Sequence, residues 1–149
     1  MWKQMVSVGC LIAGLTAASP LWAEGAAEKS GADGRHRVVL HLNSGDAKVQ
    51  RGLLSNIKHL YQELGREALT VELVAHGAGL SLFTKKETTL AGELARLKRD
   101  YGVHYTACSN TMKAMQVTRE DLIEEVGDTV PAVVRLMERQ EQGWAYIKP

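Results

Sequence analysis

Cysteine is scarce in this sequence of 149 residues, which contains only Cys10 and Cys108. Cys10 lies inside an apolar N-terminal run that we expect to be removed, so the mature chain keeps one thiol. A single thiol cannot form an intramolecular disulfide. Cys108 is therefore a buried spacer, an intermolecular link or a reactive group, and much of the functional question depends on which of these it is.

Long apolar runs are also missing. The longest, Met5–Ala18, is shorter than the about 20 apolar residues that a membrane-spanning helix needs. Lys3 precedes this run and Pro20 follows it, which is the layout of a secretory signal peptide. We expect cleavage after Ala23, with Ala18 as the alternative position, and hence a periplasmic protein that has no membrane segment once the signal is removed.

The expected domain organisation follows from this cleavage. The signal peptide spans residues 1–23, and residues 24–34 are small, polar and glycine-rich, which predicts a flexible leader. Residues 35–149 are enough for a single domain with one core.

An excess of charge of one sign is absent. The first 23 residues hold one lysine and no acidic residue, so 17 basic and 17 acidic residues remain in the mature chain. This balance gives no electrostatic reason to expect a nucleic acid or an anionic lipid surface as the partner.

Motifs for common cofactors are missing as well. The sequence contains no glycine-rich dinucleotide or phosphate-binding loop and no nucleophile elbow. A metal site built from His41, His76 and Cys108 is conceivable, but no local ligand spacing such as CxxC or HExxH supports it. We therefore predict no metal site and no cofactor.

What is present is an alternation of strand and helix patterns. Apolar runs rich in β-branched residues alternate with stripes of period 3.6, which indicates parallel strands joined by helical crossovers. The expected fold is a three-layer α/β/α sandwich with a mainly parallel sheet of about five strands. The expected strands are 37–43, 70–76, 103–108 and 144–149. The expected helices are 53–64, 90–101 and 109–116, a helix that starts at Thr118, and a helix from Pro131 to Gly143. In this last helix we expect Val133, Val134 and Met137 to face inward.

Polar residues follow three of these strands. Asn43 ends the first, His76 and Gly77 end the second, and Cys108 ends the third, before Ser109 and Asn110. Ligands of open parallel sheets bind outside the carboxyl ends of the strands. The candidate site therefore lies at this edge.

Cys108 is the leading candidate within it. A cysteine at the start of a helix is exposed to N–H groups that favour the thiolate, and Lys113 would add positive charge if it folded back. The alternative is a buried cysteine that acts as a small apolar residue. His76 would act as a base or charge partner, or would only cap its strand, whereas we interpret His41 as structural.

Two blocks of the sequence also resemble a known family. ACSNTMKAMQVTREDL and VPAVVRLMERQEQGWAYIKP, with the earlier RVVLHLNSGD and VELVAHGAGLSLF, are similar to the DsrE/DsrF-like family in its exported, single-domain branch. The resemblance covers nearly all of the mature chain. It implies a three-layer α/β fold that assembles as a homotrimer or hexamer.

The resemblance also implies a function. The best-understood members handle sulfur, carrying a persulfide on a cysteine and passing it along a relay. Transferred to this chain, it makes Cys108 the sulfur-carrying residue, with Asn43, His76, Gly77, Ser109, Asn110 and Lys113 around the pocket, and a sulfur donor or acceptor protein or a small thiol as the partner. The alternative function is a non-catalytic oligomeric protein that binds a small ligand or serves as an accessory subunit.

Overall fold

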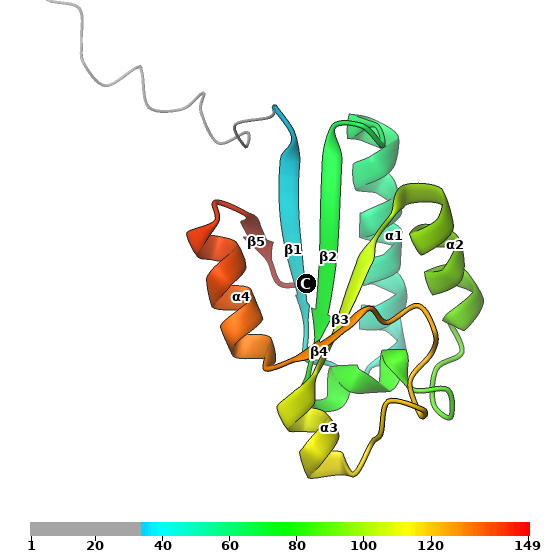
Figure 1. Cartoon of the computed structure of the whole chain (residues 1–149). Coiled ribbons are helices and arrows are strands. Elements are labelled where there is room, and N and C mark those ends of the chain that lie inside the picture. The colour runs from blue at the N-terminus through cyan, green and yellow to red at the C-terminus, as the bar shows by residue number, and fades with distance from the viewer. Residues whose placement is uncertain (1–33) are drawn as a thin grey trace, which may run out of the picture.

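The computed structural model describes residues 34–149, so the expected signal peptide and nearly all of the leader lie outside the described part. The domain contains five strands, four α-helices and a 3-10 helix (Figure 1). In chain order these are β1 (His36–Leu42), α1 (Ala47–Leu64), β2 (Leu69–Ala75), η1 (Gly77–Phe83), α2 (Ala91–Tyr101), β3 (His104–Cys108), α3 (Ser109–Met115), β4 (Asp128–Val130), α4 (Ala132–Glu141) and β5 (Ala145–Ile147).

The five strands form one sheet in the order β4-β3-β2-β1-β5, and every neighbouring pair is parallel. Helices α1 and α2 cover one face, and α4 lies on the other (Figure 1). The predicted fold class is therefore confirmed, with one layer reduced to a single helix. All strands point the same way, so their carboxyl ends share one edge of the sheet.

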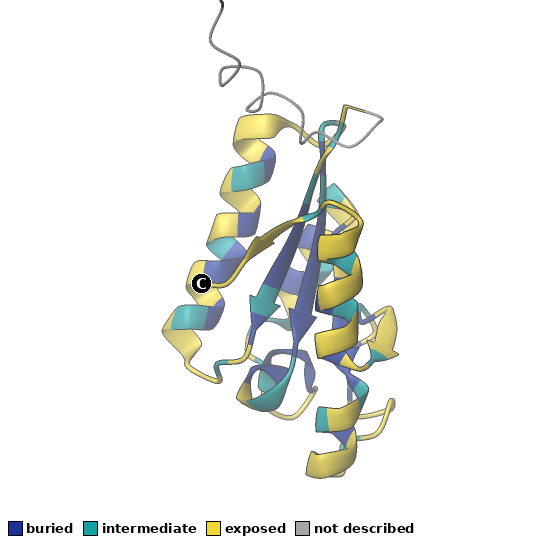
Figure 2. Ribbon diagram, turned by 90° about the vertical axis from the view of Figure 1, so that its left-hand side faces the viewer, coloured by how far each residue is buried: buried dark blue, intermediate teal, exposed yellow. Residues whose placement is uncertain are grey.

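The larger part of the core lies between the sheet and helices α1 and α2. The sequence of α1 has an apolar stripe, and its members Leu53, Leu54 and Ile57 are fully buried against the sheet. Asp46 caps the helix, because its carboxylate accepts hydrogen bonds from the N–H groups of Lys48 and Val49. Figure 2 shows the result: the central strands β1, β2 and β3 are largely buried, the edge strands β4 and β5 are exposed, and the helices are buried only along the side that faces the sheet.

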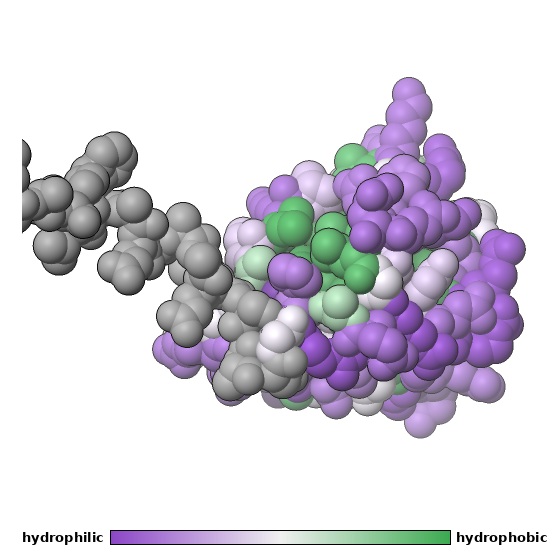
Figure 3. All heavy atoms as spheres, turned by 90° about the horizontal axis from the view of Figure 1, so that it is seen from above, coloured by the Kyte–Doolittle hydropathy of each residue, from purple (hydrophilic) through white to green (hydrophobic). Residues whose placement is uncertain are grey.

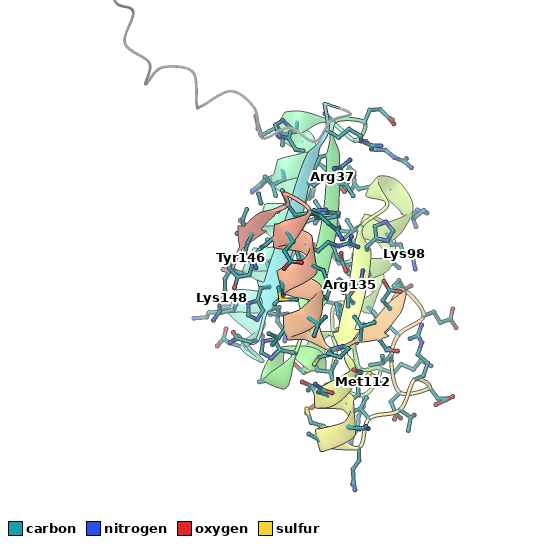
Figure 4. The ribbon with its side chains drawn as sticks, turned by 60° about the vertical axis from the view of Figure 1, so that its left-hand side comes forward. Arg37, Lys98, Met112, Arg135, Tyr146 and Lys148 are labelled. Carbon is teal, nitrogen blue, oxygen red and sulfur yellow. The ribbon has the colours of Figure 1, made fainter. Side chains whose placement is uncertain are left out.

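The other face of the sheet has a smaller core and a buried carboxylate. Val39, Val74 and Cys108 from the strands pack against Ala132 and Leu136 of α4. Farther toward the strands' amino ends lies Glu72, which is 1% exposed and forms ion pairs with Arg135 and Arg139 of α4. Figure 4 shows Arg135 between α4 and the strands. Both apolar packing and this ion-pair network therefore attach α4 to the sheet.

The segment between α3 and α4 differs from the prediction. No helix starts at Thr118: its N–H and hydroxyl groups both hydrogen-bond Asp121 Oδ2, at 2.7 and 2.8 Å, and close a turn. The chain then forms β4, an edge strand of three residues that the sequence analysis did not predict. A strand this short contains too few residues to display an alternating pattern.

Helix α4 is also rotated relative to the prediction. Val133, Val134 and Met137 were expected to face inward, but they are 73%, 45% and 51% exposed. Ala132 and Leu136 face the sheet instead. The outer surface of α4 is thus unusually apolar. Within residues 34–149, no helix combines the length and hydrophobicity needed to cross a membrane.

Candidate functional site

Cys108 lies at the carboxyl end of β3, as predicted, and is the N-cap residue of α3. It is 6% exposed and packs against the start of α4 as well as the strands. The first residues of two helices, α3 and α4, therefore meet at its sulfur. Thiolate stabilisation depends on which groups point at the sulfur from these two helices.

Four hydrogen-bond donors lie around the sulfur. The backbone N–H of Ala132 donates to Sγ at 3.4 Å, and the Thr111 hydroxyl and the backbone N–H groups of Thr111 and Asn110 also contribute. Burial alone raises the pKa of the Cys108 thiol, but these donors together outweigh it and hold the pKa below its ordinary value. The site therefore favours the thiolate through neutral donors rather than through a nearby cation.

Thr111 was not identified from the sequence. Its Oγ1 accepts a hydrogen bond of 3.0 Å from the backbone N–H of Gly77, at the end of β2. An amide N–H can only donate, so the proton of the Thr111 hydroxyl remains available for Cys108. The signal in the sequence was weak, because a threonine three residues after a cysteine has no distinctive pattern.

The other predicted residues of the site are more dispersed. Asn110 acts through its backbone N–H, and its side chain is exposed. Ser109 is the first residue of α3, and Lys113 is exposed in the last turn of that helix. Asn43 is exposed just after β1. These four residues surround the carboxyl edge of the sheet, but only Asn110 belongs to the groups that shift the pKa of the thiol.

His76 contacts His41 rather than standing alone. The two Nε2 atoms are 2.6 Å apart, and Nδ1 of His41 is 2.6 Å from the hydroxyl of Tyr146 in β5. The ring centroids of the histidines are 4.8 Å apart, whereas their Nε2 atoms are only 2.6 Å apart. The two rings therefore contact each other through their Nε2 atoms rather than through their faces. His41, which we interpreted as structural, thus joins His76 to the far edge of the sheet.

The pKa values of both imidazoles lie below the ordinary histidine value. Burial is the main cause for each. For His41 the proximity of His76 and then Lys148 adds to this effect, and for His76 the charge of Lys148 does. Figure 4 shows Tyr146 and Lys148 together on the β5 side of the sheet. Both histidines are consequently neutral at neutral pH.

The glycine turn HGAG has a structural cause. A Cβ atom on Gly79 would lie 2.5 Å from the carbonyl oxygen of Leu42, so only glycine fits where η1 crosses the end of β1. Gly77 has a φ of +54°, a conformation that other residues rarely adopt. The turn therefore positions the N–H of Gly77 toward Thr111. Across residues 34–149, no three histidine, cysteine or acidic side chains are grouped to hold a metal ion.

Comparison with known proteins agrees with this architecture. The model of the DsrE/DsrF-like family matches residues 36–149. A solved structure of the protein of unknown function MTH1491 from Methanobacterium thermoautotrophicum is 32% identical, with a TM-score of 0.71, and the match covers 76% of this chain and 99% of that one. The ychN protein of E. coli shares the fold, with 12% identity, a TM-score of 0.61, and coverage of 77% and 99%. A search of curated proteins found no match.

The fold and the site define a parallel α/β domain with its candidate site at the carboxyl edge of the sheet. The chain belongs to the DsrE/DsrF-like family.

Proposed function

We propose that this protein is a sulfur carrier that holds sulfane sulfur as a persulfide on Cys108. Family membership is consistent with sulfur-relay chemistry. The observation that carries the proposal is the set of donors around Cys108 Sγ, which lowers the pKa of the thiol even though the residue is buried. The thiolate is the nucleophile in such chemistry, so a lowered pKa increases the reactive fraction at neutral pH.

In the proposed reaction, the thiolate attacks the outer sulfur of a persulfide donor. The sulfur–sulfur bond of the donor breaks, its thiolate leaves, and Cys108 becomes a persulfide. The N–H groups of Asn110, Thr111 and Ala132 would stabilise the anionic sulfur. Asn43, Ser109 and Lys113 lie around the same edge, where they would contact the donor or the acceptor.

Burial favours a second candidate function. Cys108 is 6% exposed and packs in an apolar cluster, which is also the environment of an inert structural cysteine. In this alternative the protein is a non-catalytic oligomeric module that binds a small ligand or serves as an accessory subunit. A small ligand would then bind in the same pocket, and Cys108 would only fill space.

Alkylation separates the two functions. The native protein and the urea-unfolded protein are treated with iodoacetamide, and the native protein is also incubated with cysteine hydropersulfide and analysed by mass spectrometry. The sulfur carrier is expected to be alkylated in the native state and to gain one sulfur atom, with Cys108→Ser as the blank. Alkylation only after unfolding, with no added sulfur, would support the structural alternative.

We also propose a homo-oligomer. Apolar residues are exposed on α4, as described above. In addition, Tyr146 and Ile147 of the edge strand β5 are each 41% exposed. Apolar side chains also gather on the end of the molecule seen in Figure 3, which is otherwise mostly hydrophilic. Exposed apolar surface favours association with another protein chain, and the unpaired backbone groups of an edge strand favour pairing with another chain.

Gel filtration tests the assembly. The unmodified domain is expected to elute as a trimer or hexamer, and Met137→Glu is expected to reduce its size. Met115→Glu, on α3, is the matched control because Met115 is 47% exposed but lies on another helix. A monomeric unmodified protein would contradict the proposal.

Export to the periplasm is likewise proposed, on the signal-peptide layout of residues 1–23. Fractionation of cells that express the full chain is expected to place the protein in the periplasm. The mature form should begin at Glu24 by N-terminal sequencing. An uncleaved cytoplasmic product would overturn this part of the proposal.

A further inference from the structure

Three strands of the sheet, together with the residue that follows β2, each contribute one polar side chain to a row across it. The row runs from Cys108 on β3 through His76 and His41 to Tyr146 on β5. The strand order β3-β2-β1-β5 places the residues in this sequence. This row continues the site beyond the sulfur.

The register places the row on one face. Ala75 pairs with Ala107, so His76 and Cys108 occupy the next pair of positions. His76 still belongs to this edge of the sheet, because it is extended and its N–H donates to the carbonyl of Leu42. Neighbouring parallel strands lie about 4.8 Å apart, so the two side chains project side by side toward the α4 face.

The other end of the row follows the same rule. Tyr146 pairs with Val39, and Val39 packs in the cluster beneath α4. His41 is two residues after Val39 and so projects from the same face. A groove between β5 and α4 is lined by His41, Tyr146 and Met137, among others, and opens the row to the surface.

The two short contacts couple the protons of three residues. Between the Nε2 atoms of His41 and His76, one nitrogen must donate and the other must accept. In one arrangement, the Tyr146 hydroxyl donates to Nδ1 of His41, and Nε2–H of His41 donates to Nε2 of His76. In the other, Nδ1–H of His41 donates to the Tyr146 oxygen, and Nε2–H of His76 donates to Nε2 of His41. A proton that arrives at one end therefore changes the tautomers along the row.

We propose that His76, His41 and Tyr146 form a proton relay that takes the thiol proton of Cys108 during sulfur transfer and returns it to the leaving group. The inference rests on the proposed persulfide chemistry. His76 is the proton acceptor, because Nδ1 has no hydrogen-bond partner among residues 34–149 and Cys108 lies on the strand opposite His41. His41 and Tyr146 do not receive the thiol proton themselves: they are positioning residues whose hydrogen bonds set the tautomer of His76.

The proton and electron balance of the step is simple. The Cys108 thiol gives its proton to His76, and the sulfur attacks the outer sulfur of a donor R–S–SH. The donor's sulfur–sulfur bond breaks, R–S⁻ leaves, and it takes the proton back from His76. The products are Cys108–S–SH and R–SH, so no oxidant or reductant is needed.

The surroundings of the row favour the neutral form of each histidine. Lys148 lies near both histidines, Glu141 of α4 lines the groove beside His41, and Cys108 and Tyr146 close the two ends. Burial and the charge of Lys148 lower the pKa of each histidine. Both rings therefore start in the neutral form that a proton acceptor must have.

The test measures the rate of persulfide formation on Cys108 with cysteine hydropersulfide, from acidic to alkaline pH. We expect His76→Gln to slow the reaction at neutral pH by about 10²-fold, the range of general acid–base catalysis. His41→Gln and Tyr146→Phe should slow it by smaller factors. Because relay members act in series, His41→Gln combined with His76→Gln should be no slower than His76→Gln alone. His59→Gln, which removes an exposed histidine of α1, is the control and should match the unmodified protein.

Two results would overturn the relay. One is an unchanged rate and pH profile in His41→Gln and Tyr146→Phe. The other is a double variant, His41→Gln with His76→Gln, in which the rate reductions of the two single variants multiply, because that would indicate independent roles. Failure of the sulfur-carrier function itself would look different, since the unmodified protein would form no persulfide. In that case imidazole ¹⁵N NMR tests the coupling between the histidines and Tyr146. Tyr146→Phe is expected to shift the resonances of both His41 and His76, while those of His59 stay fixed. Unshifted His76 resonances would refute the coupling.

Discussion

The hydroxyl of Thr111 joins the ends of two strands, because its oxygen accepts the N–H of Gly77 at 3.0 Å and the same hydroxyl lowers the pKa of the Cys108 thiol. This contact makes the loop after β2 part of the thiol's environment. It also explains why a positive-φ glycine follows His76: the backbone must turn sharply there to aim its N–H at Thr111.

Replacing Thr111 by valine should reduce the reactivity of Cys108. The substitution keeps the shape but removes a donor to the thiolate, so the pKa of the thiol rises and its thiolate fraction at neutral pH falls. Hydrogen bonds to charged groups contribute about 1.5–3 kcal/mol, which corresponds to roughly a tenfold slower alkylation or more. The pH profile of iodoacetamide alkylation measures this, and Thr111→Ser, which keeps the hydroxyl, should stay close to the unmodified protein. An unshifted profile in the valine variant would show that the hydroxyl does not act on the sulfur.

The histidine pair should make the domain less stable in mild acid. Burial and neighbouring charge lower the pKa values of His41 and His76 in the folded state. In the unfolded chain they return to about 6.5, so below that pH the unfolded state binds more protons and the free energy of unfolding falls. Urea unfolding at neutral and mildly acidic pH measures the slope, which should be smaller when both histidines are replaced by glutamine. An equal slope in that variant would assign the acid sensitivity to other groups.

Replacing Glu72 by glutamine should destabilise the domain through α4. Glu72 is buried, accepts a 2.6 Å hydrogen bond from Thr106, and neutralises Arg135 and Arg139. Breaking a buried pair by removing one partner costs about 3–5 kcal/mol, because the remaining charge stays partly buried. Asp128→Asn is the matched control: this exposed partner of Arg135 should contribute less than about 1 kcal/mol. Urea unfolding of the two variants would contradict the assignment if both lost the same stability.

Gly79→Ala should also be destabilising, by about 1–3 kcal/mol, because the new methyl group would overlap the Leu42 carbonyl. Gly92→Ala is the comparison, since a Cβ at Gly92, in the first turn of α2, meets no atom within 4 Å. That substitution should be neutral or stabilising by up to about 1 kcal/mol. Thermal unfolding monitored by circular dichroism measures both, and equal effects would rule out the steric explanation.

The fold was predictable because its signals are local. The apolar stripe of α1 and the β-rich runs of β1 and β2 each extend over seven or more residues, so their periods are distinct. β4 has three residues and no readable period, and Thr118 has the residues of a helix cap but uses them to close a turn with Asp121. The rotation of α4 was hidden for another reason: its sequence has apolar residues on more than one side, and only packing against the sheet selects Leu136 over Met137.

The sequence alone determined that this chain forms a parallel α/β domain with one cysteine at the carboxyl end of a strand. Helix and strand periods are encoded in consecutive residues, and strands that are joined by helical crossovers run parallel. Only the tertiary structure brought Thr111 and Ala132 to the sulfur of Cys108, and placed His41 and Tyr146 next to His76. Those contacts join residues that are as many as 105 positions apart, and they depend on strand order and register. Register and strand order arise from the packing of the whole sheet, so no local pattern contains them.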